Sequence, residues 1–391
     1  MHILEIPSFL PPYGGYFCIE QAKALAACGH EVGILHCQQL GATVYPWHFL
    51  TARYNRWEEQ LHPFNDKRTI TLYRTNMRGI PRNILYNQRR YCKIIAEMFE
   101  EYVSRYGCPD VIHAHCAQWA GTAAMRISEK KNIPYFVTEH LSSGIFHDNY
   151  GNPWSHDLWA KELIRMALEK AKCVITVSDE SVLDLAPLFG NNFKTVTISN
   201  IIDVDFFKYK ERTERNNRPF RFCCLANANG RFYELKGYDT LLKAFSKCKN
   251  AELHIAGRET TGKRLKNAVR SLSNSKNIFL HGELSKEAVR ALLWDCDALV
   301  LATCSEMQPL VVMEAMSTGI PVVSTTAIPM ALRIPGAFFT SPVNNPDAFH
   351  EAMIAVQAVN PSEVISNAIR NMASPEIVGR KLERLFMEKS L

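Results

Sequence analysis

Short β-rich runs alternate with helical patterns along the whole chain of 391 residues. Such alternation is typical of parallel sheets covered by crossover helices. Seven runs precede residue 206, namely HILEIPSF, EVGILHC, TITLYRT, DVIHAHC, YFVTEH, CVITVS and TVTIS, and six follow residue 219, namely FRFCCLA, ELHIAG, IFLHG, ALVLAT, PVVST and AFFTSP. The chain is too long for one ordinary core, and both halves show the same alternation of strand-like and helical segments. The pattern predicts an α/β protein with two Rossmann-like, doubly wound parallel-sheet domains that face each other across a cleft.

The halves are divided by FKYKERTERNNRP, a charged and apolar-poor stretch that ends in proline. We therefore expect an N-terminal domain over residues 1–206, a linker over 207–219 and a C-terminal domain over 220–374. Residues 375–391 have the pattern of an amphipathic helix that follows the second sheet.

Composition places the chain among ordinary globular proteins. Apolar residues make up 47% and charged residues 21%, which excludes a disordered or fibrous chain. The start, MHILEIPSFLPPYGG, lacks a basic region followed by a long apolar one, and no apolar run is long enough to span a membrane. The 12 cysteines form no C-x-x-C pair, which favours reduced thiols. We expect a cytoplasmic protein without an export signal or a membrane-spanning segment.

Residues 71–95 form a basic stretch within a chain whose net charge is only +6. The stretch contains no acid, and its basic residues are Arg74, Arg78, Arg82, Arg89, Arg90 and Lys93. A solvated basic face explains it, and a patch for anionic lipid on the inner face of the membrane, or for a phosphate-bearing acceptor, is the sharper alternative. No helix-turn-helix, zinc-finger or RNA-recognition signature accompanies the charge, so we expect no nucleic-acid partner.

The first predicted strand is followed by two glycines. Gly14 and Gly15 precede a helix, where the missing side chains would let a substrate approach the backbone and the helix N-terminus. A plain tight turn is the alternative. The spacing is not G-x-G-x-x-G, so we do not expect a dinucleotide cofactor.

Two histidines, His113 and His115, lie two residues apart on a predicted strand and so project to the same side at its carboxyl end. With Cys116 adjacent, and with Glu139 and His140 ending the next strand, they could suggest zinc. Neutral histidines that hydrogen-bond a polyol fit an α/β cleft equally well, and we predict no metal.

The second half carries two cations close together. Arg231 lies five residues before Lys236, which is followed by a glycine and a helical run. Arginine can bond two oxygens at once while lysine acts as a point charge, so the pair suits a diphosphate, although a solvated surface loop is the alternative. Gly257 and Gly282 end two further strands, where exposed backbone groups could meet a base or a ribose.

Two glutamates mark the stretch after the strand ALVLAT. Glu306 follows the strand, and residues 310–316 predict one short helix. The free N–H groups around residues 308–311 can hold an anion, and Glu314, about two helical turns beyond Glu306, can accept hydrogen bonds from ribose hydroxyls. An uncompensated carboxylate in this apolar run would be costly, so we expect Glu314 to face a polar ligand.

Taken in order, these motifs resemble a retaining glycosyltransferase of family 4 with the two-Rossmann GT-B architecture. The resemblance runs along nearly all of the chain, through PPYGG with LAACGHEV, PDVIHAH, VITVS, ISNIIDVDFF, ELKGYDTLLKAF and the E-x7-E element that continues into EAMSTGIPVV. It implies sugar transfer from a nucleotide-diphosphate donor, a UDP- or GDP-sugar, to a saccharide or lipid-linked acceptor. Retention of anomeric configuration, no obligatory metal or cofactor, and a place in surface polysaccharide or glycolipid synthesis are also implied.

The resemblance also implies roles by position. His115 would hydrogen-bond the donor sugar, Lys236 would neutralise the leaving diphosphate, and Glu306 would stabilise the sugar electrostatically as the third catalytic group. His140 would lie on the acceptor side, and the last helix would cross back to the first domain. The donor-binding positions would be Gly14, Gly15, Arg231, Gly257, Gly282, Leu284, Gln308, Pro309, Leu310, Val311 and Glu314. A pair of carboxylates acting as nucleophile and acid is the competing role, and it needs the two groups within about 5.5 Å.

The sequence departs from the family pattern in four places. Ile201 and Ile202 stand where a glycine-valine pair is common, and the other three departures are in the second half. Gln308 and Pro309 stand where phenylalanine and glycine are common, several residues separate FCCLA from Arg231, and TAIPMALRIPGA replaces a Gly-Gly turn after PVVST. We expect the first-domain loops 40–65 and 140–158 to select the acceptor. A sugar phosphorylase on the same scaffold and a non-catalytic partner subunit are the alternative functions.

Overall fold

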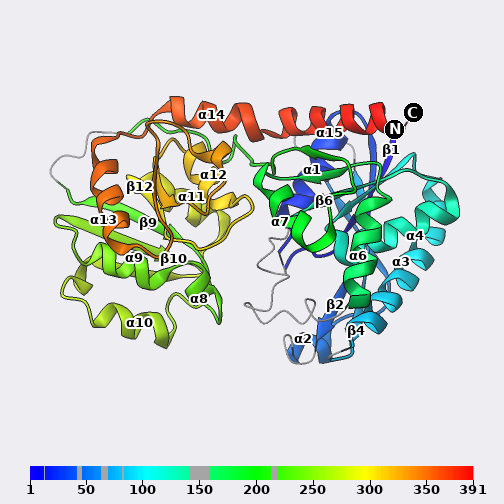
Figure 1. Cartoon of the computed structure of the whole chain (residues 1–391), viewed down its shortest axis with the longest axis horizontal. Coiled ribbons are helices and arrows are strands. Elements are labelled where there is room, and N and C mark those ends of the chain that lie inside the picture. Colours follow the sequence, from blue (N-terminus) through cyan, green and yellow to red (C-terminus); the bar gives the residue numbers. More distant parts are fainter. Residues whose placement is uncertain are drawn as a thin grey trace. The chain divides into compact units, whose positions relative to one another are not determined.

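The computed structural model describes residues 1–12, 14–41, 46–62, 69–81, 83–140, 158–212 and 218–390. The chain forms two compact units, one of Met1–Ile201 with Pro375–Leu391 and one of Ile202–Ser374 (Figure 1). The predicted fold class, with two Rossmann-like parallel-sheet α/β domains, is confirmed. Several predicted features lie wholly or partly outside the described residues: the two acceptor loops at 42–45, 63–65 and 141–157, Arg82, and the linker at 213–217.

The first unit is built on an eight-stranded sheet with the order β3-β4-β2-β1-β5-β6-β7-β8. Its strands are β1 (His2–Pro7), β2 (Glu31–Gly41), β3 (Trp57–Leu61), β4 (Ile70–Gly79), β5 (Val111–His115), β6 (Tyr135–Glu139), β7 (Val174–Thr176) and β8 (Thr195–Thr197). All neighbouring strands pair in parallel except β3, an antiparallel edge strand inside the stretch that we predicted as a loop. Without β3 the sheet is doubly wound, and the strand order reverses between β1 and β5.

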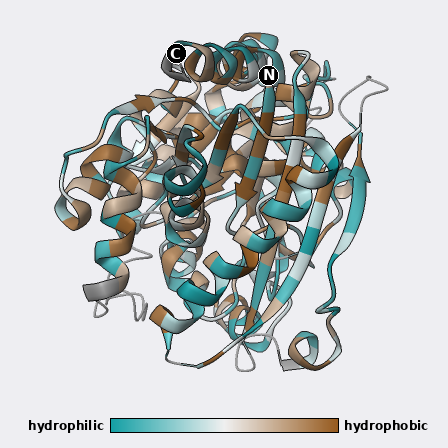
Figure 2. Cartoon of the chain, turned by 90° about the vertical axis from the view of Figure 1, so that its right-hand side faces the viewer, coloured by the Kyte–Doolittle hydropathy of each residue, from teal (hydrophilic) through white to brown (hydrophobic). Residues whose placement is uncertain are grey.

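Helices cover both faces of this first sheet. They are α1 (Tyr16–Ala27), α2 (Pro46–Thr51), α3 (Ile84–Tyr106), the single turn η1 (Ala117–Gly121), α4 (Thr122–Lys131), α6 (Leu158–Glu169), α7 (Glu180–Phe189) and α15 (Pro375–Ser390). In Figure 2 the central strands are largely brown, whereas the helices mix brown and teal along their length, as amphipathic covering helices should. The last helix, α15, packs against α1 and buries Val378, Leu382 and Phe386 beside Ile3 and Phe136 of the sheet.

The second unit has a six-stranded, fully parallel sheet with the order β11-β10-β9-β12-β13-β14. Its strands are β9 (Phe220–Leu225), β10 (Ala251–Ala256), β11 (Ile278–Gly282), β12 (Ala298–Leu301), β13 (Val322–Thr325) and β14 (Phe338–Ser341). Its α-helices are α8 (Phe232–Leu235), α9 (Tyr238–Phe245), α10 (Lys263–Arg270), α11 (Lys286–Asp295), α12 (Leu310–Ser317), α13 (Pro346–Ala355) and α14 (Glu363–Ala373). The central strands β12 and β13 are buried throughout, as strands covered on both faces are. The order reverses between β9 and β12, which is where open α/β sheets bind ligands.

Candidate functional site

The loops that follow β9 and β12 meet at this reversal point of the second sheet. The backbone N–H of Cys304, after β12, donates to the carbonyl oxygen of Leu235 at 2.8 Å. Gly237 has a φ of 64°, and a Cβ at this position would lie 1.9 Å from the carbonyl oxygen of Ala302. Only glycine therefore lets α9 begin so close to the end of β12. This close approach places Lys236 beside the residues that follow β12.

Lys236 and Glu306 form an ion pair through Nζ and Oε1. The two side chains are only 19% and 12% exposed. The Thr303 hydroxyl also donates to Glu306 Oε1 at 3.0 Å, so the carboxylate is fixed from two directions. A lysine ammonium has three donors, and Lys236 can therefore hold Glu306 while still donating to an anion.

The helix α12 begins at Leu310, as predicted, with Pro309 in an extended conformation before it. The N–H groups of Leu310 and Val311 have no acceptor within the helix, and helix N-termini of this kind attract anions. The predicted offset of two helical turns between the glutamates is wrong, because Glu306 precedes the helix and Glu314 lies one turn inside it.

Glu314 is half-buried on α12. Burial disfavours the ionised carboxylate and raises its pKa to about 7, although the positive charge of Lys286 opposes part of this shift. Near neutral pH, Glu314 is therefore poised between a neutral acid and a hydrogen-bond acceptor for a ligand.

We expect Glu314→Gln to stabilise the ligand-free protein at pH 8 and to have little effect at pH 4. The pKa of Glu314 is raised from 4.5 to about 7 in the folded protein. The loss of folding stability that its ionisation causes is therefore absent below pH 4.5, grows as the pH rises and is complete above pH 7. The linkage relation gives a gain of at most roughly 3 kcal/mol at pH 8. Calorimetric melting at both pH values measures it. The exposed Glu351 of α13, changed to Gln, serves as control, and a Glu314→Gln variant no more stable than wild type at pH 8 would contradict the expectation.

The remaining donor-side positions of this unit surround the same edge of the sheet. Gly257 directly follows β10 and Gly282 is the last residue of β11, with φ of 141° and 76°, and the Gly257 N–H donates to the Gly282 carbonyl at 2.8 Å. A Cβ on Gly257 would lie 2.2 Å from the carbonyl oxygen of Ala226, so packing alone already requires glycine there. Arg231 is exposed at the start of α8, one short helix before Lys236, and the side chain of Gln308 is buried before α12. Leu284, after β11, is half-buried.

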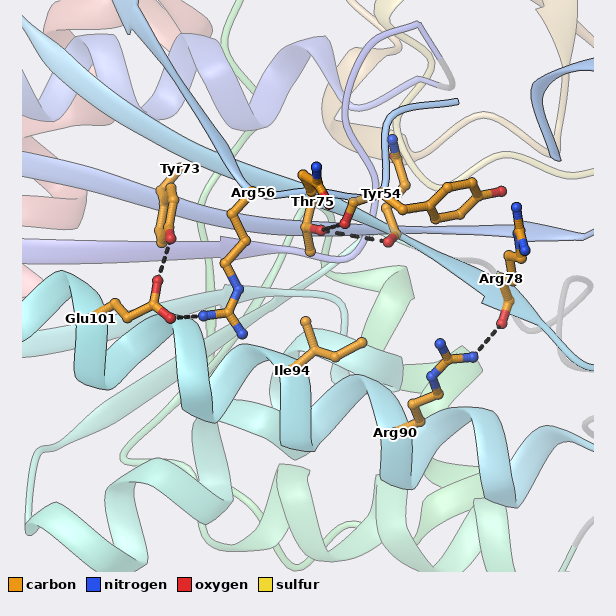
Figure 3. Close-up of a pocket in the computed structure, with 10 residues that line it drawn as sticks. Tyr54, Arg56, Tyr73, Thr75, Arg78, Arg90, Ile94 and Glu101 are labelled. Atoms are coloured by element: carbon orange, nitrogen blue, oxygen red, sulfur yellow. Dashed lines mark hydrogen bonds and ion pairs between the residues drawn. The ribbon is translucent and has the colours of Figure 1, made fainter. Parts of the chain in front are cut away.

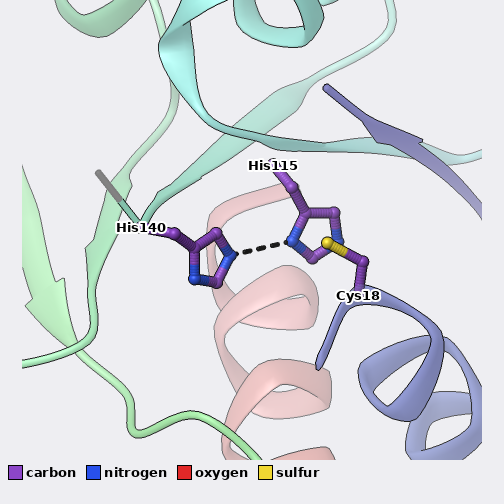
Figure 4. A group of neighbouring side chains, drawn as sticks. All are labelled: Cys18, His115 and His140. Atoms are coloured by element: carbon purple, nitrogen blue, oxygen red, sulfur yellow. Dashed lines mark hydrogen bonds between the residues drawn. The ribbon is translucent and has the colours of Figure 1, made fainter. Parts of the chain in front are cut away.

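At the corresponding point of the first sheet, a buried carboxylate joins two histidines. Glu5 on β1 lies opposite His113 on β5, and its carboxylate is 3.0 Å from His113 Nδ1 and 2.6 Å from His115 Nε2. His115 Nδ1 is 3.1 Å from His140 Nε2, as Figure 4 shows. His113 Nε2 completes the network with the Thr138 hydroxyl at 2.6 Å. A carboxylate that accepts from both rings leaves His115 Nδ1 as the acceptor for His140.

The charges of this network follow from its burial. Burial alone would raise the pKa of Glu5, but the two histidines outweigh it and lower that pKa to about 2. Burial and the nearby His113 lower the pKa of His115. Burial, together with His115 and His113, lowers the pKa of His140 far below its usual value. His115 and His140 are therefore neutral near pH 7, beside an ionised Glu5. His115 is fully buried with both nitrogens engaged, so a sugar can reach it only if the half-buried His140 turns aside.

Two groups of side chains here have metal-binding spacing: Cys18, His115 and His140 (Figure 4), and Glu5 with the two strand histidines. The zinc alternative raised from the sequence used the same three histidines but combined them with Cys116 and Glu139 in place of Cys18 and Glu5. Glu139 is instead occupied by the backbone N–H groups of residues 117 and 140, and burial raises the pKa of the Cys116 thiol well above its usual value. A metal would have to displace a bond that His115 already makes, and the absence of a metal stays a prediction.

Sequence reasoning missed Glu5, Cys18 and Thr303. Glu5 had a detectable signal, since it is a single acid within the apolar strand run HILEIP. Gly14 and Gly15 lie before α1 with φ of 109° and 75°, and a Cβ on Gly15 would lie 2.2 Å from the carbonyl oxygen of Phe9. The plain turn is therefore enough to explain Gly15.

The basic stretch is divided between two elements. Arg74 and Arg78 lie on β4, and Arg74 pairs with Glu59, whereas Arg89 and Lys93 are exposed on α3. Among the described residues, no helix combines the length and the apolar character that crossing a bilayer requires.

Two doubly wound α/β units, here with candidate site residues at the reversal point of each sheet, define the GT-B class of sugar-transferring proteins. Residues 14–206 match the glycosyltransferase family 4 model, and residues 209–369 match the model for glycosyl transferases group 1. The chain belongs to this family and is a glycosyltransferase.

Similar proteins include the putative teichuronic acid biosynthesis glycosyltransferase TuaC of Bacillus subtilis (strain 168). It is 25% identical over 324 residues, which cover 82% of this chain and 78% of TuaC. Among solved structures, sucrose-phosphate synthase from Thermosynechococcus elongatus superposes with a TM-score of 0.75 at 17% identity, over 99% of this chain and 98% of the synthase. HepE from Anabaena, in complex with UDP, superposes with a TM-score of 0.71 at 15% identity, over 99% of this chain and all of that chain. These structures support the GT-B fold.

Proposed function

We propose that the protein transfers a sugar from a nucleotide-diphosphate sugar to a saccharide or lipid-linked acceptor, with retention of configuration and without a metal. The setting would be the synthesis of a surface polysaccharide or glycolipid, which is the kind of pathway named for TuaC. Solved complexes of HepE with UDP and with UDP-glucose make a UDP-sugar the first donor to test, with GDP-sugars next.

The observation that carries this proposal is the Lys236–Glu306 pair beside the open N-terminus of α12. Cleavage of the bond between the sugar and the diphosphate builds negative charge on the phosphate and positive charge on the sugar ring. Lys236 and the N–H groups of Leu310 and Val311 would stabilise the leaving diphosphate. Glu306, held by Lys236 and Thr303, would stabilise the sugar cation electrostatically.

The proton can be accounted for without a strong base. As the acceptor oxygen forms its bond to the anomeric carbon, its proton passes to the departing diphosphate, whose bond to the same carbon breaks. His140 and His115 would orient the sugar hydroxyls as neutral groups, in keeping with their lowered pKa values. Glu5 would keep His115 in one tautomer.

Donor affinity should depend on Glu314. We expect Glu314→Ala to weaken binding of the nucleotide sugar about ten- to a hundredfold, since it removes hydrogen bonds to a charged acceptor worth about 1.5–3 kcal/mol. In the wild type, affinity should fall as the pH drops below about 7, where the carboxylate takes up a proton. A thermal-shift screen against UDP-, GDP- and ADP-sugars identifies the donor, and titrations at pH 6 and pH 8 then measure both effects. Equal affinity of Glu314→Ala and wild type at pH 8 would remove Glu314 from the donor site.

A cytoplasmic location, peripheral on the inner face of the membrane, belongs to the same proposal. It is supported by the exposed Arg89 and Lys93 on α3.

A further inference from the structure

A polar cavity of about 710 Å³ lies in the first unit between α3 and the carboxyl half of β4. Its volume falls within the range of roughly 300–1,000 Å³ that is usual for small-molecule sites. None of its lining residues belongs to the donor-side positions or to the Glu5 network. The side chains used below come from the chain before β3, from β4 and from α3: Arg56, Tyr73, Thr75, Arg90 and Glu101 (Figure 3).

At one end of the cavity a single arginine is shared between two carboxylates. Arg56 bonds Glu97 at 2.8 Å and also pairs with Glu101, which in addition accepts a hydrogen bond from the Tyr73 hydroxyl. Further along β4, the Thr75 hydroxyl donates to the Tyr54 carbonyl oxygen at 3.0 Å. Hydroxyls, carboxylate oxygens and guanidinium groups in such a row match the mixed donors and acceptors of sugar hydroxyls.

The other end carries a cation that no carboxylate neutralises within the described ranges. Arg90 reaches from α3 toward β4, where one of its nitrogens donates to the Arg78 carbonyl oxygen at 2.9 Å (Figure 3). This bond fixes the half-buried guanidinium, and its other donors have no partner among the residues that the structure describes. Arg78 also lines the cavity, and its guanidinium stacks on the Tyr54 ring at 4.5 Å. A fixed arginine with free donors is suited to two oxygens of one anionic group.

The cavity opens near the edge of the sheet that carries the histidines. The strands β4, β2, β1 and β5 are parallel neighbours, so the carboxyl end of β4 and His115 at the end of β5 share one edge. Three strand spacings separate β4 from β5, or about 15 Å. The cavity lies on the α3 face of the sheet, and the histidines lie on the face covered by α1 and α15, so an acceptor of several sugar residues would pass over this shared edge to reach both.

We propose that this cavity binds an anionic sugar residue of the acceptor. Arg90 binds its carboxylate or phosphate group, while Thr75 and the Arg56–Glu101 pair bind its hydroxyls. The assignment rests on the proposed function, because it specifies the acceptor class of that reaction: a saccharide that contains a uronic acid or a sugar phosphate.

Binding of small probes to the full-length protein tests this assignment. The probes are methyl β-glucuronide, glucose 6-phosphate, neutral methyl β-glucoside and inorganic phosphate, each titrated by calorimetry and by ligand-observed NMR. We expect at least one of the two anionic sugars to bind saturably and at least tenfold more tightly than the neutral glucoside. The anionic sugar that binds distinguishes a carboxylate from a phosphate ester. No saturable binding, equal binding of the neutral glucoside, or binding of inorganic phosphate as tight as that of glucose 6-phosphate would overturn the proposal.

Two neighbouring arginines provide a matched pair of variants. Arg90→Gln should weaken binding of the anionic sugar at least tenfold, whereas Arg89→Gln, an exposed position outside the cavity lining, should change it less than twofold. Equal losses in both variants would reduce the effect to general surface charge and overturn the assignment. Should Arg90→Gln lower the melting temperature, Thr75→Val provides a second test, and an unchanged affinity in that variant would also count against the proposal.

The probes contain no nucleotide, so the two proposals fail separately. Loss of every nucleotide-sugar interaction with probe binding intact would overturn the donor assignment and support the cavity. Nucleotide-sugar binding without any probe binding would overturn the cavity assignment alone.

Discussion

Lys236→Ala and Glu306→Ala should each lower the turnover number for sugar transfer by about 10²–10³-fold, the range seen when one fixed stabilising group is removed from a transition state. The two side chains form one half-buried pair, so each substitution also leaves the other charge uncompensated. We therefore expect the double variant to lose little more than either single variant. Release of nucleotide diphosphate, with the donor found in the thermal-shift screen, measures turnover.

Lys243→Ala is the control for the loss of a lysine from this region. Lys243 is exposed on α9, the helix that follows Lys236, and its removal should change turnover by less than about twofold. Circular dichroism establishes that all variants are folded. Turnover of Glu306→Ala within threefold of wild type would remove this carboxylate from the reaction, and the same result for Lys236→Ala would remove the lysine.

Glu5→Gln should destabilise the first unit by roughly 3 kcal/mol at pH 7. Its carboxylate is buried, and the two histidines lower its pKa from 4.5 to about 2. A group with a lowered pKa contributes its full stability above pH 4.5 and loses that contribution as the pH falls toward 2. The difference between wild type and variant should therefore shrink over this pH interval.

Tryptophan fluorescence during urea unfolding follows the first unit, because five of the six tryptophans lie in its sequence. Glu31→Gln, at an exposed position on β2, is the matched control. Glu5→Gln, unlike this control, should also alter the ¹⁵N chemical shifts of His113 and His115, since Glu5 fixes their tautomers. Unfolding curves of Glu5→Gln and wild type that coincide at pH 7 would show that the network contributes no stability.

All thirteen strands expected from the sequence are present, because buried parallel strands read as continuous apolar runs between turn residues. The strand that was missed, β3, has the sequence WEEQL, whose side chains alternate between half-buried and exposed. Its own residues favour strand formation weakly, and pairing with β4 at the sheet edge decides its conformation. Tertiary pairing of this kind leaves no local signal.

The candidate site was predictable in composition but not in its contacts. The rule that ligands bind after strands at a reversal of strand order pointed to Lys236 and Glu306, which are 70 residues apart in the chain. It could not identify Thr303 as the second partner of Glu306. Glu5 was missed for another reason. It lies in the middle of a strand, where the pattern predicts packing, and only the register with β5 turns its carboxylate toward two histidines.

The closing helix α15 has a consequence for how the protein is made. The backbone passes between the units twice, near residues 201 and 374, and α15 supplies part of the apolar cover of one face of the first sheet, together with α1. During synthesis, all residues of the second unit can therefore have left the ribosome before α15 is available to pack on the first unit. A chain that stalls or terminates before residue 375 would leave apolar surface of the first unit exposed to solvent, so we expect its dependence on chaperones to arise from that unit.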